Sequence, residues 1–203
     1  MNNLKYNCLK CGTCCHEIDS EYKKRIPLYP DEVDSLIIKA EERSVPLRVI
    51  EDLVFPDVLN KQILVVTYKF DLNNASKGCP FYSNDIGCTV HQMKPLACQA
   101  YPLALKQIDA FNFQISIDPL CNFVLKYYDQ LKNADLELLK SIFYKEYPKA
   151  IAHLNKNKKI MLKIKKLEYS NKIKIARQIS IEDFNRYLKD WERQEIKVRP
   201  KEE

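Results

Sequence analysis

The spacing of hydrophobic residues predicts two regular elements before residue 71. Four apolar side chains recur at the helical spacing i, i+3, i+4 and i+7: Val33, Leu36, Ile37 and Ala40. They predict a helix over residues 31–43, with Pro30 in its first turn, a position that proline favours. Residues 62–70 are β-branched and aromatic, which is typical of a strand. Residues 45–59 contain two prolines and fit neither pattern.

Shorter elements follow in the middle of the chain. Residues 71–78 and 83–87 are rich in turn-forming residues. A short helix is expected over residues 95–99, because proline is tolerated in a first helical turn. Residues 110–117 alternate between polar and apolar side chains, which predicts a half-buried strand.

The last third of the chain has helical spacing. We expect helices over residues 131–144 and 150–167, separated by an interruption at Tyr147-Pro148. A third helix is expected after Ser180, which suits an N-cap before an acidic first turn. The tail over residues 197–203 is charged and is expected to fray.

Length and composition suit one domain, or one domain with a helical appendage, that does not need disulfides for stability. The chain has 203 residues, of which 46% are hydrophobic, so it can bury a sizeable core. It has no apolar run of about 18 residues, and its first residues lack a signal-peptide core. We therefore expect a cytoplasmic protein with no membrane span. In that compartment, clustered cysteines are more often metal sites than disulfides.

The chain carries eight cysteines, and half of them fall within eight residues. They are Cys8, Cys11, Cys14, Cys15, Cys79, Cys88, Cys98 and Cys121. A packed core rarely needs adjacent thiols, whereas a soft metal or an iron–sulfur cluster needs several thiolates in a small volume. We therefore expect all eight cysteines to be candidate metal ligands.

The three glycines of the chain support this interpretation. Gly12, Gly78 and Gly87 each adjoin a cysteine. Glycine permits positive φ and close approach of the backbone. A chain that almost excludes glycine, yet places all three beside thiols, is expected to form tight turns around a metal.

The first cysteine run has the spacing of an incomplete ferredoxin motif. Cys8, Cys11 and Cys14 are separated by two residues each, as in a bacterial ferredoxin run, but the following x3-Cys-Pro is missing. A fourth ligand must be Cys15 or a distant cysteine. The spacing favours an iron–sulfur cluster, of the 4Fe-4S type, over zinc. Two zinc ions, one cluster with spare thiols, or one metal of each kind all remain compatible with eight cysteines.

The full cysteine pattern resembles a known family. Three motifs carry the resemblance across residues 8–121: Cys8-x2-Cys11-x2-Cys14-Cys15, Cys79-Pro80-Phe81, and Gly87-Cys88-x2-His91-x3-Pro95-x2-Cys98-x2-Tyr101-Pro102 followed by Cys121. This pattern resembles the CxxCxxCC cysteine-cluster family, which has zinc- or iron-chelating domains. Family members usually have an aromatic residue in place of His91 and arginines in place of Lys94 and Gln99.

The resemblance implies metal binding, and it also raises an enzymatic alternative. The family is similar in part to an iron–sulfur enzyme that methylates flagellin lysines, which implies lysine methyl transfer as an alternative function. The sequence contains no glycine-rich loop after a strand that would cradle a nucleotide cofactor. Whether the protein is an enzyme is left open.

The two histidines nearest the cysteines are weaker candidates. His16 follows the first run, and His91 lies three residues after Cys88. Either could be a ligand or a proton carrier. We expect each to lie outside the ligand set, behind the thiols or at the surface.

The positive charge of the chain is concentrated at its C-terminal end. Residues 153–203 carry 15 Lys and Arg against 8 Asp and Glu, a net of +7, whereas residues 1–152 carry 18 against 19, a net of −1. Nine cations form a nearly continuous run: Lys156, Lys158, Lys159, Lys163, Lys165, Lys166, Lys172, Lys174 and Arg177. Such a run could bind nucleic acid or an acidic protein, or could be a solvated helix face.

These observations together predict an α+β fold in two parts. Residues 1–122 are expected to form a small, irregular, metal-centred domain of short strands and helices. Residues 123–203 are expected to form a helical, basic C-terminal extension. The favoured function is a cysteine-ligated metal-binding protein with an iron–sulfur cluster, in a redox or metal-handling role. The alternatives are the lysine methyltransferase and a zinc-stabilised adaptor that binds nucleic acid or protein.

Overall fold

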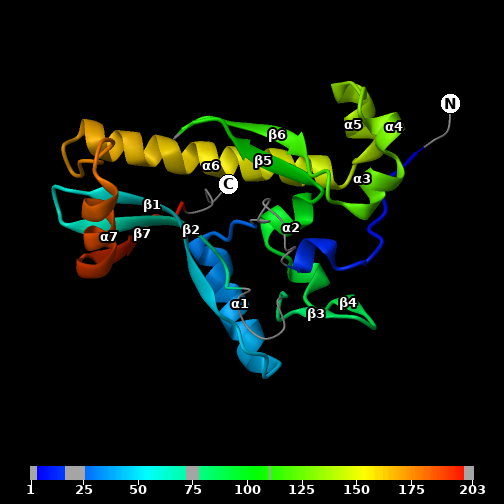
Figure 1. Cartoon of the computed structure of the whole chain (residues 1–203), viewed down its shortest axis with the longest axis horizontal. Coiled ribbons are helices and arrows are strands. Elements are labelled where there is room, and N and C mark those ends of the chain that lie inside the picture. Colours follow the sequence, from blue (N-terminus) through cyan, green and yellow to red (C-terminus); the bar gives the residue numbers. More distant parts are fainter. Residues whose placement is uncertain (1–3, 17–25, 72–77, 110, 199–203) are drawn as a thin grey trace, which may run out of the picture.

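The long helix α6 (Glu146–Tyr169) runs along one side of the molecule, and most other elements lie beneath it (Figure 1). The computed structural model describes residues 4–16, 26–71, 78–109 and 111–198. The fold is mixed α+β, with small sheets, short strands and C-terminal helices, as the sequence predicted.

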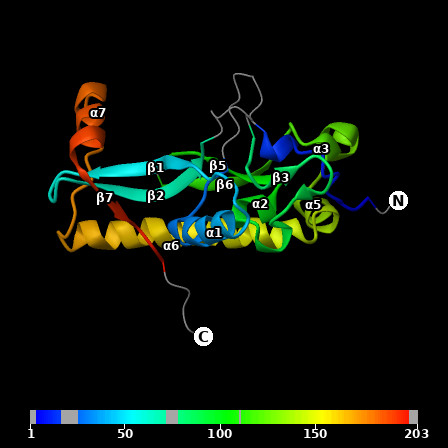
Figure 2. The same cartoon turned by 90° about the horizontal axis from the view of Figure 1, so that it is seen from below.

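The largest sheet has three strands in the order β1 (Val49–Asp57), β2 (Gln62–Phe70) and β7 (Glu192–Glu195). β1 is antiparallel to β2, whereas β7 is parallel to it. The middle of β2 is buried on both faces, which explains its continuous run of apolar residues. In the view from below, β1 and β2 lie beside α6 (Figure 2).

The first two predicted elements are confirmed. Helix α1 spans Pro30–Glu42, and β2 has the predicted bounds. The ambiguous segment contains β1, in which Pro56 pairs with Ile63. Proline is tolerated there because β1 is an edge strand of the sheet. α1 buries Val33, Leu36 and Ala40, three of the four residues that predicted it.

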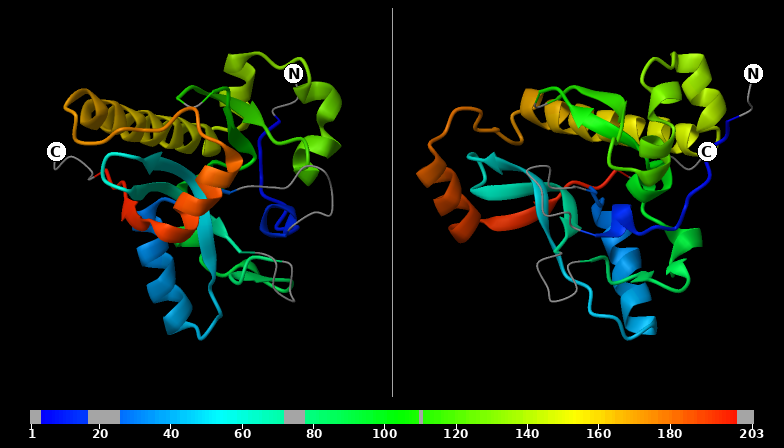
Figure 3. Two further views of the ribbon diagram at one scale, coloured as in Figure 1. Left: turned by 60° about the vertical axis from the view of Figure 1, so that its left-hand side comes forward. Right: turned by 45° about the vertical axis from the view of Figure 1, so that its right-hand side comes forward.

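The cysteine-bearing half consists of short elements (Figure 3). In chain order they are the 3-10 turn η1 (Thr13–Cys15), β3 (Tyr82–Ser83), β4 (Gly87–Cys88), the 3-10 turn η2 (His91–Met93), α2 (Leu96–Ala100), β5 (Leu103–Gln107) and β6 (Phe113–Ile117). Two antiparallel hairpins result, β3–β4 and β5–β6. The short helix and the strand expected here are both present, although residue 110 lies outside the described residues, as do 17–25 and 72–77.

The helical part differs from the prediction in two places. Within the range predicted as one helix, residues 131–144, the structure has α5 (Leu136–Ile142) and only the last residue of α4 (Tyr128–Leu131), and α3 (Asn122–Lys126) precedes both. The chain breaks because Asp135 caps α5, accepting a hydrogen bond from the Leu138 N–H at 2.8 Å. The expected interruption at Tyr147-Pro148 is also wrong, since Pro148 lies in the first turn of α6, where it costs no hydrogen bond.

The C-terminal end is more ordered than its charge suggested. α7 (Ile181–Asp190) begins as predicted, with Ser180 accepting a hydrogen bond from Asp183. β7 follows directly and was missed, because a four-residue polar strand has no apolar alternation. Lys197 forms ion pairs with Asp34 at 2.8 Å and with Glu195 at 3.1 Å, so the expected fraying does not begin there. Residues 199–203 lie outside the described residues.

Buried clusters join both sides of residue 122. One contains Tyr6, Ala100 and Leu103 together with Phe143 and Ala150. A second cluster joins the sheet and α6. Its buried residues are Tyr29, Leu64, Val66, Ile160, Met161, Ile164, Ile173, Ile175 and Ile196. The division at residue 122 stays a prediction, and the C-terminal part packs closely on the part before it. Across the described ranges, no helix has the length and apolar character needed to cross a membrane.

Candidate metal centre

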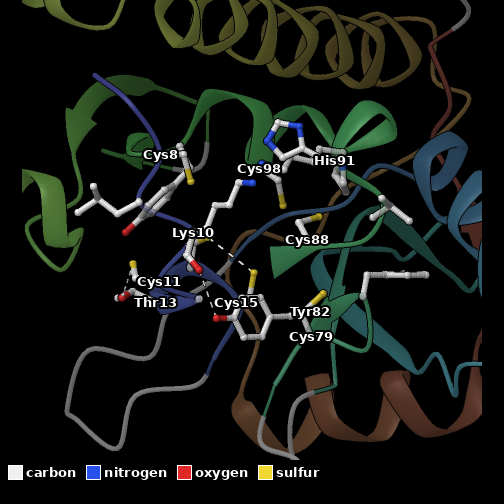
Figure 4. Close-up of a pocket in the computed structure, with 18 of the residues that line it drawn as sticks. Cys8, Lys10, Cys11, Thr13, Cys15, Cys79, Tyr82, Cys88, His91 and Cys98 are labelled. Atoms are coloured by element: carbon white, nitrogen blue, oxygen red, sulfur yellow. Dashed lines mark hydrogen bonds between the residues drawn. The ribbon is translucent and has the colours of Figure 1, made fainter. Parts of the chain in front are cut away.

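All eight cysteines line one shared cavity. They come from four parts of the chain: the N-terminal loop with η1, the β3–β4 hairpin and the residues before it, α2, and the residue before α3. Figure 4 shows Cys15, Cys79, Cys88 and Cys98 around a common space, with Cys8 and Cys11 farther along the wall. No disulfide joins any two of the eight. The fold therefore brings together cysteines that are up to 113 residues apart (8 to 121).

The N-terminal cysteine loop is bent by two residues with positive φ. Lys10 has φ of 53° and Gly12 has φ of 74°. Gly12 also accepts a hydrogen bond from the Cys15 N–H at 2.7 Å, which closes η1. The left-handed conformation costs glycine little. This bend places Cys11, Cys14 and Cys15 on the wall of one cavity.

Each of the three glycines lets the N-terminal loop pack against the segment 78–88. A Cβ on Gly12 would lie 2.5 Å from the Tyr82 ring, and one on Gly78 would lie 2.9 Å from the His16 ring. Gly87, with φ of 78°, lies against the Lys10 side chain. The sequence analysis predicted turns at these glycines, and the structure adds that two of them are sites of close contact between cysteine segments.

Backbone pairing aligns Cys15 with Cys79. His16 and Gly78 form an isolated antiparallel bridge, and the Cys79 N–H donates to the Cys15 carbonyl at 2.6 Å. A hydrogen bond with the Cys14 thiol lowers the Cys15 pKa. The combined opposing effects of a hydrogen bond with Cys79, of burial and of the nearby Cys79 and Cys88 are larger, so the net result is a pKa raised to about 12. Cys15 is therefore a neutral thiol in the metal-free protein, and a bound metal would replace its proton.

Helix α2 supplies Cys98 to the same group. Burial raises the Cys98 pKa well above its ordinary value, and the nearby Cys14, Cys15 and Cys88 add to the increase. Burial also raises the pKa of Cys88. The Lys94 ammonium acts in the opposite direction on both Cys88 and Cys98. Lys94 is thus a cation positioned to offset negative charge on these thiols.

A buried tyrosine, Tyr6, and a half-buried one, Tyr101, accompany Cys8 and Cys121 along the cavity wall. Tyr6 hydrogen-bonds with the Cys8 side chain, and Tyr101 hydrogen-bonds with Cys121. Burial raises the pKa of both phenols, so they stay neutral. Burial likewise raises the Cys121 pKa, although the backbone N–H groups of Val124 and Phe123 at the start of α3 act against it. Cys121 is buried beside Tyr101, whereas Cys8 stays exposed beside Tyr6.

A comparison with protein families gives one match. The family model that matches covers residues 7–122, more than half of the chain, and is described as "Putative zinc- or iron-chelating domain". The chain belongs to the CxxCxxCC family. Comparison with curated proteins gave no match, and neither did comparison with solved structures. The family predicted from the sequence is confirmed, and the comparisons give no support for similarity to the flagellin methylase.

The donor set fits the zinc or iron chelation that the description of the CxxCxxCC family gives. Eight thiols form a soft donor set, and two lysines, Lys10 and Lys94, line the same cavity. Within the described ranges, no three Cys, His, Asp or Glu side chains are already close enough to hold a single ion. The Cys14 and Cys15 sulfurs are 3.7 Å apart. Binding would therefore draw the thiols together, or would use a group larger than one ion.

The two histidines take different places around the CxxCxxCC cavity. His16 Nδ1 lies 2.9 Å from the Gly12 carbonyl oxygen, and its ring packs edge-on against Tyr82 with centroids 4.9 Å apart. Its role is to hold the loop. His91 is exposed at the rim, where Lys94 and burial lower its pKa.

Several residues of the CxxCxxCC site were not found by sequence reasoning. Three of them, Tyr6, Lys10 and Tyr82, line the cavity. The fourth, Glu32, is distant in sequence but accepts a hydrogen bond from the first residue of α2. Lys94 was noted only as a departure from the family pattern. Tyr6 lies two residues before Cys8, a proximity that could have indicated it. Nothing in the sequence near Glu32 signals its contact with α2.

Proposed function

We propose that this protein binds an iron–sulfur cluster through its cysteines and serves in electron transfer or metal handling. The observation that carries the proposal is the convergence of eight thiols from four chain segments on one cavity. When bound, such a cluster supplies one-electron redox chemistry. All eight cysteines are proposed as candidate ligands. The first set comprises Cys14, Cys15, Cys79, Cys88 and Cys98, because each is hydrogen-bonded to another thiol of the group or has its pKa raised by one.

The remaining cavity residues have roles that suit a thiolate-bound cluster. Lys10 and Lys94 supply positive charge beside a centre whose ligands are anionic. Tyr6 and Tyr101 place neutral phenols beside Cys8 and Cys121, and Cys121 is buried. Low solvent access and nearby charge are both known to tune cluster potentials. The ferredoxin-like spacing of Cys8, Cys11 and Cys14 supports iron–sulfur over zinc.

Zinc is the alternative metal. The Cys14 and Cys15 sulfurs, 3.7 Å apart, match the edge of a tetrahedral zinc–thiolate site, about 3.8 Å for Zn–S bonds near 2.3 Å. A zinc ion held this way would connect the loops without redox chemistry.

The deciding experiment is anaerobic purification followed by iron, sulfide and zinc analysis and an absorbance spectrum. We expect a brown protein with iron and sulfide in equal amounts and a visible band that bleaches on reduction. A colourless protein with stoichiometric zinc would overturn the iron–sulfur proposal and favour the zinc alternative. The cytoplasmic location predicted from the sequence stays a prediction, and it would keep the thiols reduced.

Lysine methyl transfer also stays a prediction. It rests on the resemblance alone, and the described site adds nothing specific to it. Methyl incorporation into lysine-bearing protein substrates, abolished in Cys14→Ala, is the measurement that would revive it.

A second function is proposed for the basic face of α6, the binding of an acidic partner. A shallow hollow on this face is lined by four lysines: Lys159, Lys163, Lys166 and Lys172. Of these four, Lys163 also donates to the Lys197 carbonyl at 2.7 Å. Three other cations of the predicted run have structural contacts. Lys156 pairs with Asp31 at 2.8 Å, Arg177 pairs with Glu168 at 2.6 Å, and Lys165 lies over the Phe111 ring at 4.7 Å.

Binding to the basic face is tested by salt-dependent titration with RNA, DNA and an acidic peptide. Neutralising Lys159, Lys166 and Lys172 together should weaken binding and flatten its salt dependence. Neutralising Lys126, Lys132 and Lys140 on α3–α5 is the matched control. Equal effects of the two triple variants would contradict a specific site on α6.

A further inference from the structure

We infer that Cys15 and Cys79 form a reversible disulfide, which closes the cysteine cavity to metal when the protein is oxidised before it is loaded. The two residues belong to segments that are far apart in the chain, and both line the cavity. The inference rests on the proposed function in one respect, since it states what controls loading of that metal. Formation of the disulfide itself does not depend on which metal the cavity binds.

The backbone holds Cys15 opposite Cys79. His16 and Gly78 form an antiparallel bridge, and the next pair in the same register is Cys15 with Cys79, joined by the 2.6 Å hydrogen bond from the Cys79 N–H to the Cys15 carbonyl. Residues directly opposite each other in an antiparallel pair have Cα atoms about 4.5–5.5 Å apart. Disulfides need Cα atoms about 4.4–6.8 Å apart. The two cysteines therefore meet this requirement without a movement of the backbone.

The two side chains lie on the same side of the paired segments. Opposite residues of an antiparallel pair share one face, and this face belongs to the cavity wall. The Cys15 thiol is hydrogen-bonded with Cys79, and Figure 4 shows the two side chains near each other. Both thiols are only partly buried, so a small oxidant can reach them. Gly78 permits the close approach, since a Cβ at this position would lie 2.9 Å from the His16 ring.

Cys14 is the nearest competitor, because its sulfur lies 3.7 Å from that of Cys15. These two residues are adjacent, however, and consecutive Cα atoms are only about 3.8 Å apart across a trans peptide bond. That separation is below the range that disulfides need. Among the described residues, no other two cysteines lie opposite each other in a strand pair or an isolated bridge, and Cys88 lies opposite Tyr82. The register therefore selects one pair of thiols from the eight.

Hydrogen peroxide is a sufficient oxidant for this step. One sulfur of the pair attacks the peroxide and becomes a sulfenic acid, while its proton leaves with the other hydroxyl group as water. The second sulfur then attacks the first. The Sγ–Sγ bond forms, the S–O bond breaks, and the hydroxyl group leaves as a second water with the proton of the second thiol. The two thiols lose two electrons in all, and the peroxide is reduced to water. A thiol reductant reverses the disulfide by exchange.

The disulfide removes two members of the first ligand set. Cys14, Cys88 and Cys98 remain in it, one thiolate fewer than the four that a 4Fe-4S cluster or an all-cysteine zinc site takes. The oxidised protein should therefore fail to load metal until a reductant restores both thiols. A metal that is bound first occupies the same sulfurs and should prevent the disulfide.

The test is oxidation of the full-length, chelator-treated protein with an equimolar amount of hydrogen peroxide, followed by alkylation and tryptic mapping without reductant. Trypsin leaves two peptides with three cysteines each, one with Cys11, Cys14 and Cys15 and the other with Cys79, Cys88 and Cys98. Single serine variants therefore assign the bond. The two peptides should be linked in the wild type and in Cys14→Ser, which is the control. The link should be lost in Cys15→Ser and in Cys79→Ser.

Three results would overturn the inference: a first disulfide between any other pair, a link that persists in Cys79→Ser, or equal metal uptake by the oxidised and reduced proteins. Uptake of iron with sulfide, and of zinc, is measured on both forms, which separates this inference from the proposed function. Metal uptake by the reduced protein together with a different disulfide rejects the inference alone. The expected disulfide in a protein that takes up no metal even when reduced supports the Cys15–Cys79 site and rejects the metal proposal.

Discussion

The side chain of Glu32, at the start of α1, accepts a hydrogen bond from the backbone N–H of Leu96 at 2.7 Å. The two residues are 64 positions apart, and Leu96 is the first residue of α2. The other oxygen of the same carboxylate accepts from the Tyr29 N–H at 2.9 Å. One buried carboxylate thus fixes the helix that presents Cys98 to the cavity.

Replacing Glu32 by alanine is expected to reduce both stability and metal binding. The substitution leaves two backbone N–H groups without an acceptor, and each costs about 1–3 kcal/mol if it stays buried. Release of α2 should also shift Cys98. Urea unfolding measures the first effect, and metal content after dialysis measures the second. Glu42→Ala, at the exposed end of α1, is the control, since its ion pair with Lys39 contributes little. Full metal content and unchanged stability in Glu32→Ala would contradict this role.

Gly12→Ala is expected to disrupt the N-terminal cysteine loop. The new Cβ would lie 2.5 Å from the Tyr82 ring, and the backbone would have to keep φ at 74°. The left-handed conformation alone costs about 1–2 kcal/mol for a residue with a side chain. Metal content and thermal stability should both fall.

A double variant separates the two causes. Tyr82→Ala removes the ring, so Gly12→Ala should cost less in that background, but the cost of positive φ should remain. Additive effects of the two substitutions would mean that the contact between residue 12 and Tyr82 is not the source of the loss.

Stability should fall as pH decreases from 6.5 toward 4, because of His153. This residue is 3% exposed, its Nε2 has no partner among the described residues, and burial with Lys156 nearby lowers its pKa from 6.5 to about 4. The unfolded chain binds a proton in this interval that the folded protein does not. The contribution is therefore complete above pH 6.5 and is lost as pH falls toward 4, by about 3 kcal/mol in all.

The measurement is urea unfolding at several pH values for the wild type and for His153→Phe. The free energy of unfolding of the wild type should fall relative to that of His153→Phe as pH decreases. The reason is that only the wild type must bury an imidazole that prefers to be protonated. Other titrations, including the raised pKa of buried Glu32, act in both proteins and cancel in this difference. A difference that is constant with pH would contradict the assignment.

Removal of the metal should loosen the cysteine-bearing half more than the sheet. Residues 8–16 and 78–88 are connected mainly through the cavity, the His16–Gly78 bridge and the glycine contacts, whereas β2 is buried between β1, β7 and α6. Hydrogen exchange with and without a chelator should show lost protection in the first group and retained protection in β2. Equal loss in both would mean that the metal stabilises the whole chain as one unit.

The sequence predicted those elements whose cause is local. The i, i+3, i+4 spacing is sufficient for α1, and the apolar run 62–70 is sufficient for β2, because a central strand buried on both faces needs such a run. Ser180 was recognised as a cap for the same reason, since its hydrogen bond reaches only to Asp183.

Elements that depend on distant partners were not predictable. β7 is polar and is a strand only because β2 lies beside it. For the site, the cysteine pattern predicted which residues would gather, and all eight line one cavity. It did not predict Glu32 or Tyr82, because their contacts join segments whose proximity only the fold creates.

The parallel pairing of β7 with β2 has a consequence for biosynthesis. β7 follows α6 and α7 in the chain, so the ribosome releases the third strand of the sheet after every cysteine and after the long helix. Domains fold progressively as the chain emerges. The nascent thiol cavity can therefore acquire its metal while one edge of β2 is still open, and pairing of β7 closes that edge as a final step.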